Sequence, residues 1–514
     1  MYSSNDWFSD IVDHNTSGGA PPVQPAEHKT MKNVIKFKLL LVMIGALAMP
    51  GLGHAASLLE VYQQALQSDP RIHEAEARRM AALEAEPQAR GVYLPQIDFS
   101  GGWSKDNQQG SGVINQFVEV PPGSGNFEVV PIPFESETEN ETTQWRFDLR
   151  QSIFRWDQIV GLRRADKTVA KAEADREAAQ QDLVIRVGQT YFDVLGAEDR
   201  LTSLHKNRLA IARQLEQAKQ RFEVGLIAIT DVQESQAAYD QAVADEIGAK
   251  RVLATAREFL REITGEYVSN LSAPGDEFPM RTPTPAAEVD WVDLALSQNL
   301  ALVSSRLDEK LARDEISFRR NGHYPTVDLV ANLGESDTDG QQDTGQGFLD
   351  TRRDFETDSI GIQVTVPIFS GGATSSRVRE AVYLHRAARE QLQRVTRETE
   401  RQTRDAYLGV MAEMARVEAL EQAVESSQTA LEATQAGFDV GTRTIVDVLD
   451  SQFALYRSIT LFYQARYDYL MNALRLKQAA GSLQIQDLEE IDRWLTERPT
   501  PEELFAAEAA AATE

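Results

Sequence analysis

The sequence predicts a mixed α/β membrane protein in which long antiparallel helical hairpins are joined to short amphipathic strands, with the whole plan duplicated along the chain. Three observations support this prediction. A hairpin-tip sequence occurs around Gly225 and again around Gly441, and a repeated supersecondary unit indicates internal duplication. Two long stretches without proline permit long helices. Four segments alternate apolar and polar residues, as half-buried strands do.

The first 55 residues predict an exported protein. Residues 31–55 combine a lysine-containing start, an apolar run from Leu39 to Met49 and small residues up to Ala55, which is the pattern of a secretory signal peptide. A single transmembrane helix is the alternative, but the run is shorter than the roughly 20 residues that a span needs. We expect residues 1–30 to be a polar extension upstream of the probable start at Met31.

Four segments of the mature chain predict strands with one apolar and one polar face. They are Pro95–Trp103, Trp145–Ile153, Val327–Leu333 and Ile360–Ile368. An ordinary sheet packed on a core is the alternative, but the polar faces carry charges that suit a wet lumen better than a protein interior. These charged residues are Asp98, Arg146, Asp148, Arg150 and Asp328. We therefore expect a transmembrane β-barrel that faces lipid outside and water inside.

Four strands cannot close such a barrel alone. The smallest membrane barrels have about eight strands, and an open edge in lipid leaves backbone groups unpaired. Several copies must therefore share one barrel, and the strand pattern by itself allows two, three or four copies. The polar segments between paired strands, 104–144 and 335–357, are expected to be mobile outer loops.

Long helices are expected before and after each tip. No proline occurs from Phe134 to Ala273 or from Ile368 to Arg498, and a proline inside a helix costs roughly 3 kcal/mol. The arms at about 157–222 and 372–438 would each span roughly 100 Å if continuous. After the second tip, apolar residues recur at coiled-coil spacing. They are Ile445, Val448, Leu455, Ile459, Phe462, Tyr469, Ala473 and Leu476.

The tips themselves have recognisable helix signals. Gly441 interrupts the helical pattern, because glycine readily ends a helix. Thr444 is a predicted N-cap, and Asp447 stands three residues later in the capping-box position. In the first copy, Gly225 is predicted to end the helix and Thr230 is predicted to be the N-cap. The two tips are expected near residues 222–231 and 438–450.

The duplication defines the expected domains. Each half reads as helix, strand, loop, strand, long helix, tip and return helix, with upstream helices at about 58–92 and 287–321. The first repeat is expected over 56–285 and the second over 286–490. The tail at 491–514 is rich in alanine and glutamate and is expected to be disordered.

Composition excludes several classes of function. The formal net charge of -27 argues against a nucleic-acid partner, whose phosphates require a basic surface. Cysteine is absent, which removes disulfides, thiolate metal sites and a lipid-anchored cysteine. The histidines of the mature chain have no metal-ligand spacing, and acids on long helices are usually solvated. We therefore expect no enzyme activity, no catalytic residues, no metal site and no cofactor.

The quoted segments resemble the TolC family of outer-membrane efflux proteins. The resemblance is carried by the tips Val224–Gln233 and Val440–Asp450 and by the shorter motifs Tyr62–Ala65, Leu94–Gln96 and Gln151–Phe154. It extends over about residues 57–490. It implies a homotrimer with one twelve-stranded barrel in the outer membrane of a Gram-negative bacterium and a coiled-coil α-barrel in the periplasm. It also implies an exit duct for multidrug efflux and type I protein secretion.

The resemblance further implies partners and site residues. The partners are a periplasmic adaptor (membrane fusion) protein, an inner-membrane efflux transporter or ABC exporter, and outer-membrane lipid. The residues that match the periplasmic gate of the family are Gln214, Asp231, Phe438 and Arg443. Phe438 stands where the family usually has tyrosine, so one hydroxyl is missing. For Asp231, a favourable place in the first turn of a helix is the alternative explanation.

Asp447 and Asp450 match the cation-binding ring at the entrance of the family's tunnel. They are three residues apart, so their side chains share one face of a helix. If that face points to the axis of a trimer, like charges converge there and attract cations. Helix capping with Thr444 is the alternative explanation for Asp447.

Two other functions remain as alternatives. An exported structural coiled coil, such as an adhesin-like stalk, would explain the long helices but not four strands placed symmetrically in the two halves. A secreted enzyme would need a cluster of catalytic or metal-ligating residues, and the sequence offers none. The channel explains both the helices and the strands.

Overall fold

The computed structural model describes residues 55–511, apart from 269, 276–277 and 344–346. The expected polar extension and all of the expected signal peptide except Ala55 therefore lie outside the described residues. The helices are α2 Leu58–Ser68, α3 Pro70–Leu83, α4 Ala85–Gly91, α5 Trp156–Glu223, α6 Ile229–Thr264, α7 Glu288–Gln298, α8 Leu300–Arg320, α9 Ala373–Asp439, α10 Ile445–Ala479, α11 Ile485–Asp492 and α12 Pro501–Ala511. The strands are β1 Gln96–Glu119, β2 Phe127–Phe154, β3 Ala273–Pro274, β4 Thr326–Asp343, β5 Phe348–Thr365 and β6 Leu495–Thr496.

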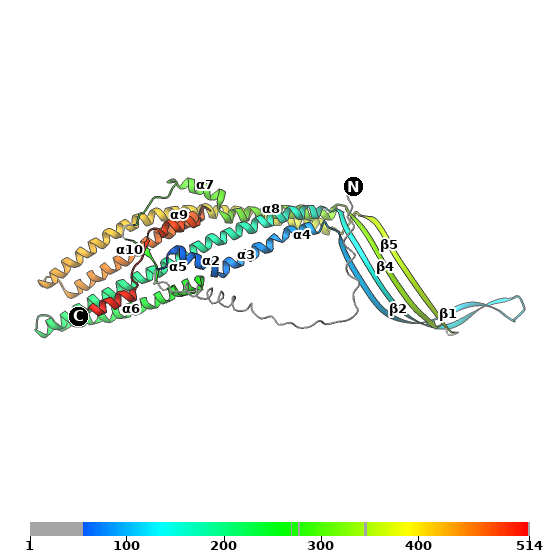
Figure 1. Ribbon diagram of the computed structural model, residues 1–514, viewed down its shortest axis with the longest axis horizontal. Coiled ribbons are helices and arrows are strands. Elements are labelled where there is room, and N and C mark those ends of the chain that lie inside the picture. Colours follow the sequence, from blue (N-terminus) through cyan, green and yellow to red (C-terminus); the bar gives the residue numbers. More distant parts are fainter. Residues whose placement is uncertain (1–54, 269, 276–277, 344–346, 512–514) are drawn as a thin grey trace, which may run out of the picture. The chain divides into compact units, whose positions relative to one another are not determined.

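Two very long helices lead to the tips. α5 has 68 residues and α9 has 67, and each is about 100 Å long at 1.5 Å per residue. α6 returns along α5, and α10 returns along α9 (Figure 1). No helix in the described part of the chain combines the length and the apolarity that a membrane crossing requires.

The helices upstream of the strands are broken rather than continuous, so this part of the sequence-based expectation is wrong. Asp69 separates α2 from α3, and its carboxylate accepts the N–H groups of Arg71 at 2.8 Å and Ile72 at 3.1 Å. Pro70 follows Asp69, and a residue before proline is disfavoured in the helical region. Asn299 makes the corresponding break between α7 and α8, and it accepts the N–H of Leu302 at 3.0 Å.

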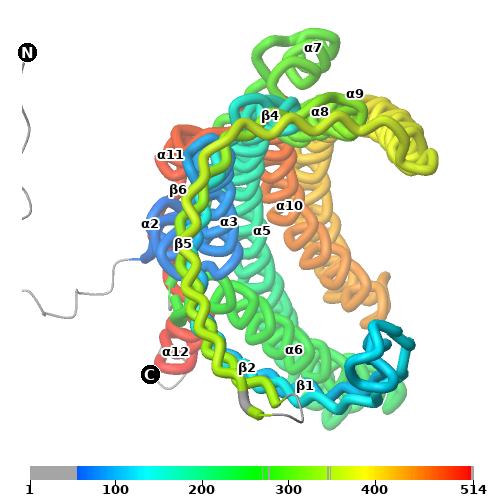
Figure 2. Tube along the Cα trace, turned by 90° about the vertical axis from the view of Figure 1, so that its right-hand side faces the viewer, coloured from blue at the N-terminus to red at the C-terminus, as the bar shows by residue number. Residues whose placement is uncertain are grey.

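The core lies where α2, α5, α6, α10 and α11 meet. Tyr62, Tyr191 and Leu470 are almost fully buried there. The hydroxyl of Tyr191 donates to the carbonyl of Ser272 at 2.6 Å, so its polar end is satisfied inside the core. Figure 2 shows α5 and α10 side by side, as their contacts also indicate. The two hairpins are therefore joined firmly at one level and run on from it to their tips.

The four long strands form one antiparallel sheet in the order β1-β2-β4-β5, which leaves β1 and β5 as its edges. In the register, Phe99 lies opposite Phe147, which in turn lies opposite Leu333. These three side chains share one face and are all exposed. The row beside them, Asp98, Asp148 and Asn332, belongs to the other face. The sheet thus has one exposed apolar face and one polar face, as the alternation predicts.

Asp328 lies at the end of the sheet next to the helices and is only 1% exposed. It accepts hydrogen bonds from Arg150 at 2.7 Å and from Arg155 at 2.9 and 2.8 Å. These hydrogen bonds compensate the buried carboxylate, whose removal from water would otherwise cost folding free energy. The ion pairs join β2 and β4 near the point where β2 passes into α5.

The expected outer loops are mostly strand, so that expectation is wrong. β1 extends to Glu119 and β2 begins at Phe127. β4 ends at Asp343 and β5 begins at Phe348. The polar composition of these segments is typical of loops, but their residues pair across neighbouring strands. For example, the hydroxyls of Thr142 and Thr338 lie 3.2 Å apart. Such cross-strand pairs stabilise a sheet without apolar residues.

The expectation of a disordered tail over residues 491–514 does not hold for the part that the structure describes. α12 begins after Thr500, whose hydroxyl accepts the N–H of Glu503 at 3.2 Å. The ring of Phe505 stacks on His205 of α5, with 3.6 Å between the centroids. Alanine and glutamate favour a helix, and the ring of Phe505 together with the ion pair of Glu502 and Arg257 holds this helix against α5 and α6.

Candidate functional site: the paired hairpin tips

Both tips end their first helix in the same way. Gly225 has φ 76° and Gly441 has φ 79°, a conformation that glycine adopts without strain. After α5, the N–H of Gly225 donates to the carbonyl of Phe222 at 2.8 Å. After α9, the N–H of Gly441 donates to the carbonyl of Phe438 at 3.0 Å. The duplicated sequence therefore builds the duplicated turn that it predicts.

The two return helices begin differently. Thr444 caps α10: its hydroxyl accepts the N–H of Asp447 at 3.2 Å, while its own N–H donates to the Asp447 carboxylate at 2.8 Å. In the first tip the N-cap is Ala228, which has no side-chain cap. The prediction of Thr230 as an N-cap is wrong, because Thr230 is the second residue of α6. Ala228, not Thr230, occupies the position that matches Thr444 in the repeat.

The structure places the four predicted gate residues near the tips but does not join all of them. Gln214 is half-buried on α5, and its side-chain oxygen has no hydrogen-bond partner among the residues that the structure describes. Asp231 lies in the first turn of α6, and Phe438 lies in the last turn of α9. Arg443 is exposed in the second tip. Among the ion pairs of the described residues, none joins Arg443 to Asp231, and the ion pair between the tips is that of Arg221 with Asp439.

One contact between the tips escaped the sequence-based reasoning. Arg221 of α5 donates to the carboxylate of Asp439 on α9 at 2.9 Å, and its guanidinium lies 4.8 Å from the ring centroid of Phe438. The available signal was Asp439 itself, a carboxylate at the C-terminal end of a helix, where the helix dipole disfavours it. A nearby cation offsets this unfavourable charge, and Arg221 is that cation.

Asp447 and Asp450 lie one turn apart on α10, as predicted. Asp447 is half-buried and Asp450 is exposed. Hydrogen bonds from the N–H and then the hydroxyl of Thr444 lower the pKa of Asp447 below its ordinary value. Asp447 is therefore ionised at neutral pH as well as serving in the cap. Within the described part of a single chain, no group of three or more potential ligands is placed to bind a metal ion.

A buried cluster behind the first tip joins α5 to α6. Glu246 of α6 is 7% exposed and accepts hydrogen bonds from Arg208 at 2.5 Å and from His205 at 3.3 Å, while Lys250 pairs with it at 2.8 Å. Burial raises the pKa of Glu246, but the hydrogen bonds from Lys250, Arg208 and His205 outweigh it and lower the pKa to about 2. The cluster fixes the hairpin that carries Arg221.

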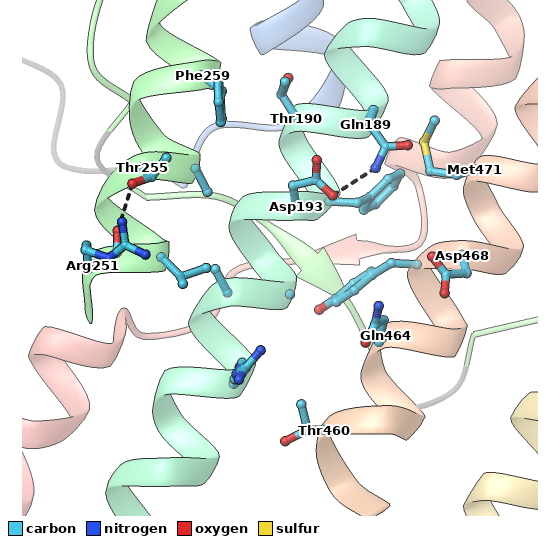
Figure 3. A pocket seen from close by; sticks show the side chains of 17 residues that line it. Gln189, Thr190, Asp193, Arg251, Thr255, Phe259, Thr460, Gln464, Asp468 and Met471 are labelled. Carbon is cyan, nitrogen blue, oxygen red and sulfur yellow. Dashed lines mark hydrogen bonds between the residues drawn. The ribbon is translucent and has the colours of Figure 1, made fainter. Parts of the chain in front are cut away.

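A cavity of about 420 Å³ lies on α5 between α6 and α10 (Figure 3). Asp193 of α5 and Asp468 of α10 line it, and burial raises the pKa of both. Gln189 donates to the carboxylate of Asp193 at 2.8 Å, and Figure 3 marks this bond with a dashed line. Phe259 of α6 adds an apolar wall. The cavity therefore lies beside the buried core that joins the two hairpins.

Comparison with known proteins places this geometry in a family. The family described as "Outer membrane efflux protein" matches residues 61–266 and 291–482, which is more than half of the chain. The chain is 36% identical over 444 residues to outer membrane protein TolC of Vibrio cholerae serotype O1, covering 86% of this chain and 94% of that protein. It is 28% identical over 441 residues to the alkaline protease secretion protein AprF of Pseudomonas aeruginosa, covering 85% and 86%.

A solved structure shows the same fold. The CmeC outer membrane channel of Campylobacter jejuni superposes with a TM-score of 0.66 at 16% sequence identity, covering 87% of this chain and 95% of that one. The fold, the family match and the relatives agree. The chain therefore belongs to the outer membrane efflux protein family, and its location is the outer membrane of a Gram-negative bacterium.

Proposed function

We propose that three copies of this chain form a channel through the outer membrane, which serves as the exit duct of efflux pumps and type I secretion systems. The observation that carries the proposal is the four-stranded sheet with one exposed apolar face and two open edges. In lipid, each unpaired backbone group at such an edge costs several kcal/mol. Closure by further copies removes these edges, and three copies give twelve strands.

The two hairpins supply the second half of the duct. α5 pairs with α6 and α9 pairs with α10 toward the tips, and the parts of α5 and α9 nearer the sheet pack against α8. Three copies would place six such hairpins around one axis as a helical barrel. In this proposal the chain divides into two repeats, 56–285 and 286–490, and residues 31–55 are removed as a signal peptide.

The kinds of partner follow from the family. AprF and the PrtF protein of Dickeya chrysanthemi are named as protease secretion proteins, and CmeC is an outer membrane channel. These relatives support a periplasmic adaptor and an inner-membrane efflux transporter or ABC exporter as partners of the tips. An adhesin-like stalk without a channel is not favoured, because it gives the sheet no role. We assign no catalytic step to the chain.

Gating belongs to the tips in this proposal. Gln214, Asp231 and Arg443 would form polar contacts between copies, and with the ring of Phe438 they would narrow the periplasmic end. Asp447 and Asp450 would converge from three copies into a ring of carboxylates, which raises the local cation concentration. The exposed side chain of Asp450 and the ionised state of Asp447 support this role.

Single-channel recording tests the proposal. The purified protein is added to a planar lipid bilayer, and the expected result is stepwise ion conductance from an oligomer that survives heating in detergent. The same oligomer without conductance would overturn the channel and favour the stalk. The absence of both oligomer and conductance would overturn the shared barrel as well.

A further inference from the structure

Arg221 joins the two hairpin tips within a single chain. Its Nη2 donates to Oδ1 of Asp439 at 2.9 Å, and its guanidinium carbon lies 4.8 Å from the centroid of the Phe438 ring. Both partners belong to the last turn of α9, whereas Arg221 belongs to the last turn of α5. One cation therefore bridges the free ends of two helices whose contacting residues are 218 positions apart in the sequence.

The position of Asp439 explains why this bridge is favourable. The C-terminal end of a helix carries a partial negative charge that repels a carboxylate and attracts a cation. α9 has no basic residue in its last turn, so its own sequence leaves Asp439 uncompensated. Arg221 is a cation at the C-terminal end of α5, where the helix dipole favours it, and it also offsets the negative charge at the C-terminal end of α9. Separation of the tips would therefore remove a compensating charge from α9.

The two duplicated tips are not equivalent, because only the first one has an arginine that can form this bridge. The second-tip residue that matches Arg221 is Gly437, which has no side chain, and Phe222, which matches Phe438, is exposed. A Cβ at Gly437 would meet Cγ of Arg443 at 2.8 Å, so glycine leaves room for Arg443 beside its own hairpin. The reciprocal contact is thus impossible, and the link between these tip positions depends on Arg221.

We propose that Arg221 is a gate-positioning residue, which binds the last turn of α9 through Asp439 and Phe438 in the closed state and releases it on opening. The inference rests on the proposed channel function and adds a contact inside each copy to the contacts proposed between copies. Because Arg221 is 32% exposed and Asp439 is 54% exposed, dissolved salt screens their attraction. The contact with the Phe438 ring is less sensitive to salt.

Conductance of substituted channels tests the inference. Arg221→Gln and Asp439→Asn are each expected to raise the mean single-channel conductance at low salt, with a smaller increase at high salt. The double variant should conduct no more than the higher single variant, because both changes break one contact. Exchange of the two charges, Arg221→Asp with Asp439→Arg, should return the conductance toward that of the parent.

Lys219→Gln is the matched control, since it removes an exposed positive charge from the same turn region of α5. Equal conductance in Arg221→Gln and Lys219→Gln would overturn the inference, as would additive effects of the two single changes. A parent protein that conducts no ions would refute the proposed channel instead. The two failures are therefore distinguishable.

A chemical bridge provides a second measurement that does not depend on the single variants. The chain contains no cysteine, so Arg221→Cys with Asp439→Cys creates one defined pair. Linking the pair with a short bismaleimide is expected to lower the conductance to the parent value or below, while the unlinked double variant conducts more than the parent. Equal conductance before and after linking would contradict a role of this contact in opening.

Discussion

Replacement of Glu246 by glutamine should destabilise the α5–α6 hairpin in a manner that depends on pH. The change removes the carboxylate to which Arg208, Lys250 and His205 bind. The hydrogen bonds lower the pKa of Glu246 from its ordinary 4.5 to about 2. A folded-state pKa below the unfolded value means that the ionised group stabilises the folded state above about pH 4.5 and loses this effect as pH falls toward 2.

The size of the effect follows from the same values. A pKa lowered from 4.5 to about 2 corresponds to about 3 kcal/mol of stability at pH 7 and to less than half of that at pH 3. The melting temperatures of the parent and Glu246→Gln, followed by circular dichroism in detergent, should therefore differ about twice as much at pH 7 as at pH 3. Glu234→Gln on the exposed side of α6 is the control and should show no such dependence. An equal difference for Glu246→Gln at both pH values would refute the reasoning.

Three further outcomes are expected. Substitution of Asp447 and Asp450 together by alanine should abolish block by multivalent cations from the periplasmic side and reduce cation preference while oligomers persist; block as strong as in the parent would place the ring elsewhere. Arg443→Ser should raise single-channel conductance, and Phe438→Tyr should lower it or leave it unchanged; unaltered conductance in Arg443→Ser would remove that residue from the gate. Gly481→Ala should lower the melting temperature, because Gly481 has φ 74° and a Cβ there would collide with a backbone carbonyl before α8; an unchanged melting temperature would show that this turn relaxes freely.

Features that depend on a few neighbouring residues could be predicted from the sequence. The turns at Gly225 and Gly441 and the cap formed by Thr444 and Asp447 use bonds between residues at most five apart. The faces of the strands follow from alternation alone, because side chains of a strand point to opposite sides in turn. Threonine is a favoured N-cap residue, but α6 begins at Ile229, so Ala228 takes the cap position although its side chain has no acceptor.

Features that depend on packing between distant segments could not be predicted. The polar strand extensions look like loops until their partners across the sheet are known, as for Thr142 and Thr338. The composition of α12 is typical of a disordered tail, and the partner of its Phe505, His205, lies on a helix about 300 residues earlier in the chain. The contact of Arg221 with Asp439 requires knowledge of how two hairpins lie side by side.

The number of chains in the purified complex tests the central claim most directly, because the sheet of one chain leaves β1 and β5 as open edges. The mass of the detergent-solubilised protein, measured by native mass spectrometry after detergent removal in the gas phase, should equal that of three mature chains. A complex of three chains that persists when the tips are altered at Arg221 or Arg443 would locate its stability in the shared barrel and not in the gate. A complex of one, two or four chains would contradict the twelve-stranded channel.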